Sequence, residues 1–210
     1  MKKPELRGLY CITDPALAQQ TSLKLEQMVE QAILGGARII QYRDKQATAS
    51  EQLETAGRLC QLCKQHGAVF LVNDDPRLAQ AVDAHGVHLG QGDSQLAKAR
   101  SLLGPDKIIG ITCHAELELA LLAEQQGADY VAFGRFFPSQ SKPEAPPASS
   151  ELLPEARENL TIPIAAIGGI TPDNGSSLLE ARADMLAVIH AVFGQPDIRR
   201  AAENFSRLFD

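Results

Sequence analysis

The chain alternates, eight times over, between a short apolar run and a longer segment whose apolar residues have helical spacing. Near-continuous apolar strands are typical of a parallel sheet that is buried on both faces. Eight consecutive strand–helix repeats favour an α/β fold closed into a single (β/α)8 TIM barrel. An open doubly wound sheet is the alternative, but the G-x-G-x-x-G fingerprint is missing after the first strand. We predict strands at 8–13, 38–42, 68–72, 86–89, 107–111, 129–133, 162–167 and 185–189.

Helices are predicted between these strands, and residues 1–210 are expected to form one domain, a length that suits a single α/β barrel. Ser50 is the expected cap of a long helix over 50–65, and Gly67 marks its end. Residues 134–150 form the longest polar loop, which we interpret as an active-site lid. The other predicted helices lie at 23–34, from Pro76 onward, and at 94–103, 115–126, 150–158, 172–181 and 196–208.

Composition and charge narrow the function classes. The apolar content of 44% and charged content of 22% are those of an ordinary soluble globular protein. A net charge of −6 argues against nucleic acid or a membrane surface as partner, so an anionic substrate must be attracted by local basic groups or a metal. No apolar run approaches eighteen residues and no signal peptide is evident, so a cytoplasmic location is expected. The sequence leaves open whether the chain forms a homo-oligomer.

Four cysteines are present, and two of them, Cys60 and Cys63, have a spacing that metal sites also use. This pair lies in the middle of a predicted helix, and no second pair accompanies it. We therefore expect reduced, structural cysteines and no disulfide.

The stretch 68–93 carries two carboxylates at the ends of consecutive predicted strands. Parallel strands place their carboxyl ends on one side of the sheet, so Asp74 and Asp93 are expected to face one pocket. Paired carboxylates there suit Mg²⁺ shared with a substrate phosphate. The alternative is that Asp74 or Asp75 caps the helix opening at Pro76 and that Asp93 caps the next helix.

Other polar residues and glycines follow the remaining strands, where barrel enzymes carry their chemistry. These residues also have structural alternatives. In one, Arg43, Asp44 and Lys45 form an ordinary solvated loop; in another, Thr112 and His114 cap the helix that follows them. Gly168 and Gly169 have the clearest functional interpretation, since turns after the seventh and eighth strands often bind phosphate through backbone N–H groups. The full set of strand-end residues reads as a phosphate-rich site: Asp14, Gln41, Arg43, Lys45, Asn73, Asp74, Asp93, Thr112, His114, Ser139, Ser141, Lys142, Gly168, Gly169, Ile189 and His190.

Taken in order, these motifs resemble those of the thiamine-phosphate synthase family over essentially the whole chain. Any one motif alone is weak, whereas the ordered set is specific. The resemblance rests on GLYCITD (8–14), QYRDK (41–45), VNDD (72–75), GVHLGQGD (86–93), GITCH (110–114), FPSQSK (137–142) and AIGGI (166–170).

The resemblance implies a Mg²⁺-dependent transferase. Its reaction joins 4-amino-2-methyl-5-hydroxymethylpyrimidine diphosphate to the phosphate of 5-(2-hydroxyethyl)-4-methylthiazole, giving thiamine phosphate and pyrophosphate. Arg43, Lys45, Thr112 and Lys142 are the implied catalytic residues, and Asp74 and Asp93 the implied Mg²⁺ ligands. The implied contacts to the pyrimidine diphosphate are Gln41, Tyr42, Arg43, Asp44, Lys45, Asn73, Thr112 and Lys142, and those to the thiazole phosphate are Ser139, Gln140, Ser141, Gly169, Ile189 and His190.

Some positions depart from the family pattern. Thr112 stands where Ser is common, and Ser139 and Ser141 stand where Thr is common, so the hydroxyls are kept. His190 replaces a frequent Ser, which puts the thiazole-phosphate contact in doubt if a hydroxyl is needed there. Arg182 and Met185 interrupt the usual approach to the eighth strand.

Two other functions compete. A thiazole tautomerase of the same fold does not need the full diphosphate and metal site, and a non-catalytic phosphate-binding protein does not need both carboxylates. The presence of Arg43, Lys45 and Lys142 together with both carboxylates favours the synthase.

Overall fold

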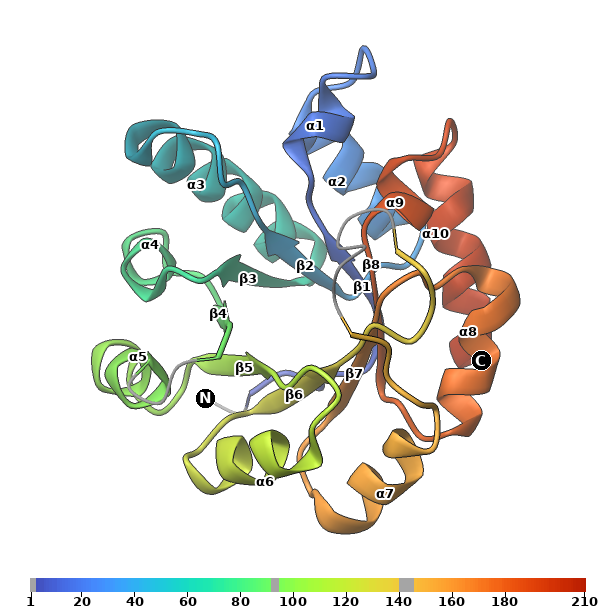
Figure 1. Cartoon of the computed structure of the whole chain (residues 1–210). Coiled ribbons are helices and arrows are strands. Elements are labelled where there is room, and N and C mark those ends of the chain that lie inside the picture. Colours follow the sequence, from blue (N-terminus) through green and yellow to red (C-terminus); the bar gives the residue numbers. More distant parts are fainter. Residues whose placement is uncertain (1–2, 92–94, 140–145) are drawn as a thin grey trace.

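The structure is a computed structural model that describes residues 3–91, 95–139 and 146–210. The described residues form a closed barrel of eight parallel strands in sequence order, and β1 pairs with β8 to close it (Figure 1). The helices surround the strands on the outside, which confirms the predicted (β/α)8 fold. The strands are β1 (Gly8–Ile12), β2 (Ile39–Tyr42), β3 (Val69–Asn73), β4 (Gly86–Leu89), β5 (Ile108–Thr112), β6 (Tyr130–Phe133), β7 (Ile164–Ile167) and β8 (Met185–Val188).

The helices follow the predicted alternation, with two additions. The short helices α1 and α9 directly follow β1 and β8, and each has only four residues. So short a helix shows no apolar periodicity, which explains why neither was predicted. The helices are α1 (Pro15–Ala18), α2 (Leu25–Leu34), α3 (Ala49–His66), α4 (Pro76–Ala81), α5 (Gln95–Leu103), α6 (Leu117–Gln125), α7 (Leu152–Asn159), α8 (Pro172–Glu180), α9 (His190–Phe193) and α10 (Ile198–Ser206), followed by the 3-10 turn η1 (Arg207–Phe209).

The helix caps correct one prediction and exclude one structural alternative. Helix α3 is capped by Thr48 and not by Ser50, because Thr48 and Glu51 form a reciprocal capping box. Helix α6 begins after Glu116, so neither Thr112 nor His114 is its N-cap residue. The predicted end of α3 is confirmed, since Gly67 is its left-handed C-cap with φ of 70°.

The apolar interior has two parts that follow from the alternation of side chains along each strand. Tyr10 and Ile12 of β1 point into the barrel, whereas Leu9 and Cys11 pack in the layer between the strands and the helices. All four cysteines are buried and free, as predicted.

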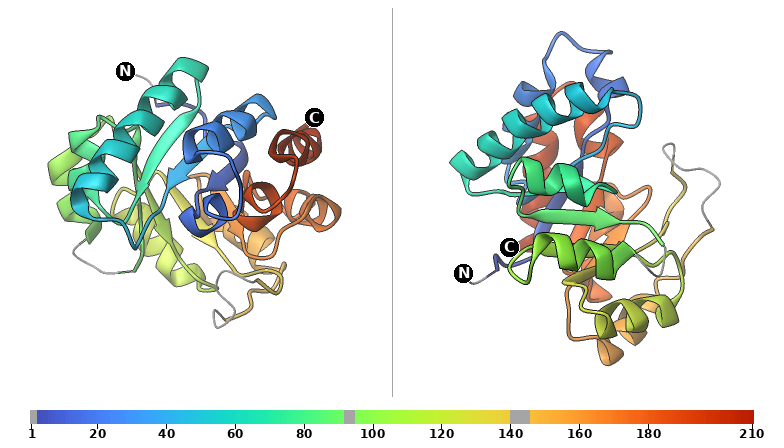
Figure 2. Two further views of the ribbon diagram at one scale, coloured as in Figure 1. Left: turned by 90° about the horizontal axis from the view of Figure 1, so that it is seen from above. Right: turned by 90° about the vertical axis from the view of Figure 1, so that its left-hand side faces the viewer.

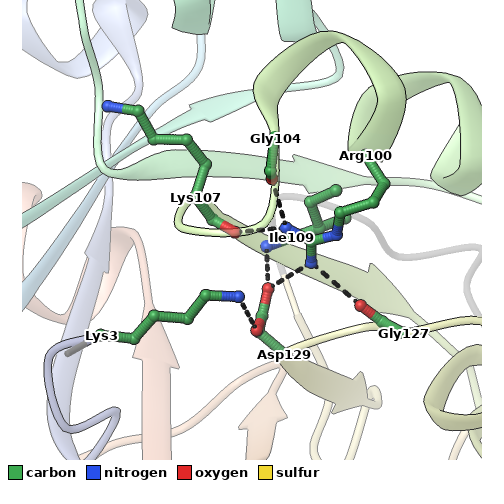
Figure 3. A network of polar contacts seen from close by, with 7 residues as sticks. All are labelled: Lys3, Arg100, Gly104, Lys107, Ile109, Gly127 and Asp129. Atoms are coloured by element: carbon green, nitrogen blue, oxygen red, sulfur yellow. Dashed lines mark hydrogen bonds and ion pairs between the residues drawn. The ribbon is translucent and has the colours of Figure 1, made fainter. Parts of the chain in front are cut away.

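The amino ends of the strands are tied together by side chains that precede them. Asp129, just before β6, accepts hydrogen bonds from the Ile109 N–H of β5 at 2.8 Å and from Arg100 at 2.7 Å, and forms an ion pair with Lys3 at 2.5 Å (Figure 3). Asp184, just before β8, accepts the Ile164 N–H of β7 at 2.7 Å in the same way.

The two ends of the barrel are therefore distinct. The N-terminal segment lies at the end opposite to the loop that follows β6 (Figure 2). The polar residues predicted at the carboxyl ends of the strands therefore belong to the end of the barrel opposite to the N-terminal segment.

In the part of the chain that the structure describes, no helix combines the length and apolarity that crossing a bilayer requires.

Candidate active site

The ends of β3 and β4 lie side by side, since Asn73 and His88 are register partners. The chain turns at Asp74, whose φ of 63° is unusual for a residue other than glycine but is tolerated by Asp. Its backbone N–H bonds to the His88 carbonyl at 2.8 Å, which fixes the turn against β4. The carboxylate of Asp74 is thereby held at the mouth of the barrel.

The two neighbouring carboxylates have different tasks. Asp75 is the N-cap of α4, accepting the N–H groups of Arg77 and Leu78 at 2.8 and 3.0 Å. Asp74 instead accepts from the Asn73 side-chain amide at 2.7 Å and from the Gly90 N–H at 3.3 Å. The capping alternative therefore holds for Asp75 and fails for Asp74.

The surroundings of Asp74 fit a cation ligand. Both of its hydrogen-bond donors are neutral, and no Lys, Arg or His among the described residues forms an ion pair with it. A carboxylate oxygen that accepts one such bond retains further lone pairs for a hard cation. Asp93, the second predicted ligand, lies outside the described residues, which contain no group of three or more His, Cys, Asp or Glu side chains able to hold a metal.

The segment after β2 is held from two sides. The Arg43 N–H donates to the Thr13 hydroxyl at 3.0 Å, and Thr13 is fully buried. The Asp44 carboxylate accepts the Gln46 and Ala47 N–H groups at 2.9 and 3.1 Å, which forms a tight turn. Arg43 and Lys45 therefore flank a fixed backbone, and Thr13 is a support that the sequence reasoning missed.

Gln41 and Tyr42, adjacent in β2, face opposite sides. The Gln41 side chain lies inside the barrel, is 2% exposed and donates to the Tyr10 hydroxyl. The Tyr42 ring packs in the outer layer under the helices, and burial followed by the Asp44 charge raises the pKa of its phenol to about 12. A contact between Tyr42 and a substrate would thus come from its backbone.

A chain of buried polar groups crosses the barrel interior below the carboxyl ends of the strands. His88 bonds Thr112 on β5 at 2.8 Å and Tyr130 on β6 at 2.7 Å. Tyr130 in turn bonds Tyr10 at 2.9 Å. Sequence reasoning missed these roles of Tyr10, His88 and Tyr130, although polar residues at inward positions of otherwise apolar strands were a usable signal.

The glycines after β7 make room for the loop after β6. A side chain at Gly168 would overlap Arg135, and one at Gly169 would overlap the Phe137 and Pro138 backbone. The Phe137 N–H also donates to the Gly168 carbonyl at 3.0 Å. This close approach requires both glycines, which have φ of 105° and 62°, and it brings Ser139, next to Pro138, toward the end of β7.

The end of β8 lies beside the end of β7, where Ile167 is the register partner of Ala187. Ile189 is the N-cap of α9, and His190 is the first residue of that helix. The His190 ring lies against Gly194, where any larger residue would collide with it. The structure thus groups Ser139, Gly169, Ile189 and His190 around the last two strand ends, whereas Gln140, Ser141 and Lys142 lie outside the described residues.

Comparison with known proteins identifies relatives of this chain. The family model described as thiamine monophosphate synthase matches residues 9–192. A thiamine-phosphate synthase of Alcanivorax borkumensis is 50% identical over 207 residues, covering 97% of this chain and 94% of the relative. One of Marinobacter nauticus is 53% identical over 204 residues, covering 96% of this chain and 90% of the relative.

A solved structure agrees with these relatives. The thiamine phosphate pyrophosphorylase from Pyrococcus furiosus matches with a TM-score of 0.86 and 39% identity, over 96% of this chain and 94% of that protein. Both the fold and the sequence are therefore shared over nearly the full length. The chain belongs to the thiamine monophosphate synthase family and is an enzyme of the transferase class.

Proposed function

We propose that the protein joins 4-amino-2-methyl-5-hydroxymethylpyrimidine diphosphate to 5-(2-hydroxyethyl)-4-methylthiazole phosphate, releasing pyrophosphate and forming thiamine phosphate. Family membership supports the product, and the ordered strand-end motifs support the two substrates. The observation that carries the metal dependence is the difference between two adjacent carboxylates: Asp75 caps a helix, whereas Asp74 has only neutral partners among the described residues.

Asp74, together with Asp93, would hold Mg²⁺ at the ends of β3 and β4. The donor set fits, since carboxylate oxygen is the ligand that Mg²⁺ prefers in shared phosphate sites. When bound, the ion neutralises negative charge on the diphosphate leaving group. Asn73 fixes the Asp74 carboxylate through its amide at 2.7 Å and so presents it in one orientation.

The reaction is a substitution at the methylene carbon of the pyrimidine. The bond from this carbon to the diphosphate oxygen breaks, and the electron pair leaves with pyrophosphate. The electron-rich aminopyrimidine stabilises the resulting cation, and the thiazole nitrogen then supplies the electron pair for the new carbon–nitrogen bond. No side chain needs to act as nucleophile.

The residues of this chain bind, orient and stabilise charge. Arg43 and Lys45, presented by the Asp44 turn, and Lys142 supply positive charge to the leaving diphosphate. Thr112 supplies a hydroxyl at the end of β5. Gly169, Ser139 and the Ile189–His190 segment form the end of the pocket that takes the thiazole phosphate.

The test measures pyrophosphate release and thiamine phosphate formation with both substrates, with each alone, and in the presence of a chelator. We expect both products only with both substrates and Mg²⁺. Isomerisation of a thiazole without pyrophosphate release would identify a tautomerase, and binding without turnover would identify a non-catalytic protein.

A matched pair of variants tests the metal assignment. Asp74→Asn removes charge from the proposed ligand, so the Mg²⁺ concentration for half-maximal activity should rise at least tenfold. Asp75→Asn is the control, because Asn caps helices nearly as well as Asp, and its Mg²⁺ titration should match the wild type. Equal Mg²⁺ curves for both variants would remove Asp74 from the metal site.

A further inference from the structure

Five polar side chains form one continuous hydrogen-bonded chain through the barrel. It runs from Gln41 on β2 through Tyr10 and Tyr130 to His88 and ends at Thr112. The two phenol oxygens lie 2.9 Å apart, the Tyr130 oxygen lies 2.7 Å from His88 Nδ1, and His88 Nε2 lies 2.8 Å from the Thr112 hydroxyl oxygen. The chain therefore connects two residues of the proposed pocket from beneath.

A glycine on β5 and the packing of three rings allow these polar groups to come within hydrogen-bond distance. Gly110 on β5 lies under the Tyr130 ring, and a side chain at this position would overlap the ring and its hydroxyl. The rings of His88 and Tyr130 are stacked with centroids 5.5 Å apart, and Tyr10 meets Tyr130 edge-on at 6.1 Å. Packing thus holds each ring in the orientation that its hydrogen bonds need.

The Gln41 amide favours one of the two directions of donation that these bonds allow. It donates to the Tyr10 oxygen, which leaves the Tyr10 proton for Tyr130. In this direction Tyr130 donates to His88 Nδ1, and a neutral imidazole then carries its proton on Nε2 and donates to the Thr112 oxygen. Burial raises the pKa of both tyrosines far above the usual range, so both phenols keep their protons.

The direction of this chain has a consequence at its end. When Thr112 accepts from His88, as this direction requires, its own O–H is left to donate. Phosphate oxygens only accept hydrogen bonds, so a donating hydroxyl at the end of β5 suits a diphosphate. The same Thr112 with its proton turned toward His88 would present only lone pairs and would repel the substrate.

We propose that Tyr10, Tyr130 and His88 are positioning residues that turn the Thr112 hydroxyl proton toward the diphosphate of the substrate. The proposal rests on the proposed function for the identity of the substrate. None of the three residues touches the substrate in this scheme, and each acts through Thr112.

The first test reads the tautomer of His88 directly and needs no activity. The imidazole ¹⁵N spectrum of the wild-type protein at pH 8, assigned by comparison with His88→Gln, should show the proton on Nε2. A proton on Nδ1 would mean that the chain runs the other way, with Thr112 donating to His88, and would overturn the proposal even if the enzyme makes thiamine phosphate.

The second test is a double-mutant cycle between Tyr130→Phe and Thr112→Val. Losing one orienting hydrogen bond should lower kcat about fivefold to tenfold in the wild-type background. In the Thr112→Val background, Tyr130→Phe should change kcat less than twofold, because there is no hydroxyl left to orient. Equal losses in both backgrounds would show that Tyr130 acts on stability or packing alone.

Conservative replacements separate orientation from packing. His88→Gln keeps a side-chain N–H that can reach Thr112 and should retain most of kcat, whereas His88→Leu should lose it about tenfold. His85→Asn is the matched control, because His85 precedes β4 at the opposite end of the strand and accepts only the Phe70 N–H at 3.0 Å. It should leave kcat unchanged. Equal kcat for His88→Gln and His88→Leu would contradict the proposal.

A failure of the proposed function leaves a different signature. If the wild-type protein released no pyrophosphate with both substrates, the assigned reaction would be wrong, and the tautomer measurement would still report the direction of the chain. A working wild-type enzyme with no coupling in the cycle would refute the positioning role alone.

Discussion

Replacing Asp129 by Ala should destabilise the barrel strongly while leaving its catalysis intact. Asp129 links three separate parts of the chain at the amino ends of the strands: the Ile109 N–H of β5, Arg100 of α5 and Lys3 (Figure 3). The side chain is 17% exposed, so its interactions are only partly screened by water. The proposed pocket lies at the other end of the strands.

The magnitude follows from what each partner loses. The Ile109 N–H would be left without its acceptor at 2.8 Å, which costs about 1–3 kcal/mol for a buried donor. Arg100 keeps the carbonyls of Gly104 and Gly127 at 3.0 and 2.9 Å, so its loss is limited to about 1 kcal/mol. Lys3 is 31% exposed and contributes at most about 1 kcal/mol.

These contributions amount to about 2–5 kcal/mol, which corresponds to a fall in Tm of about 4–20 °C for a chain of this length. Urea unfolding followed by circular dichroism measures the loss, and pyrophosphate release measured well below the transition reports catalysis. Asp129→Asn, which keeps an acceptor for Ile109, should lose about half as much. Glu118→Ala, at an exposed position of α6, is the control. If Asp129→Ala lowered the unfolding free energy no more than Glu118→Ala, the contacts of Asp129 would contribute no stability and the reasoning would be refuted.

Two further predictions concern a cap and a histidine. Thr48→Ala should lower the unfolding free energy by about 1 kcal/mol because it opens the capping box of α3. Ser50→Ala, two residues further on, should change it little, and equal effects in urea titrations would put the cap elsewhere. Burial, and then the charges of Lys64 and Lys107 against that of Asp83, lowers the pKa of His85 below its ordinary 6.5, so the unfolded chain takes up the proton first as the pH falls. The unfolding free energy should therefore decrease as the pH falls below about 6.5 and should level off below the folded-state pKa. This decrease should be smaller in His85→Asn, because the Asn side chain keeps an acceptor for the Phe70 N–H without titrating. Parallel pH profiles for the two proteins would contradict the assignment.

The barrel could be predicted from the sequence because each strand is recognisable without reference to the others. Each is a short apolar run, and β4 begins and ends at the residues predicted, Gly86 and Leu89. Cap positions were harder, since Thr48 and Ser50 are both favoured cap residues and only the Thr48–Glu51 spacing separates them. Helix α9 could not be seen, because four residues are too few for a periodic signal.

The polar chain inside the barrel escaped prediction for a different reason. Strand patterns show which residues alternate but not which distant side chains meet across the barrel axis. Tyr10 and Tyr130 are separated by 120 residues, yet their hydroxyls lie 2.9 Å apart. Gly110 is a local clue beside the inward polar residues, and its meaning depends on the Tyr130 ring above it.

Carboxylates at the two ends of this barrel differ in their partners and not in their residue type. Asp129 and Asp184, at the amino ends, each take a strand N–H together with an arginine. Within the described residues, Asp74, at a carboxyl end, accepts from an amide and a backbone N–H and from no charged group. A carboxylate already neutralised by arginine gains little from a metal ion, whereas one held by neutral donors keeps its full charge for a ligand. This difference places stability at one end of the barrel and leaves charge available for chemistry at the other.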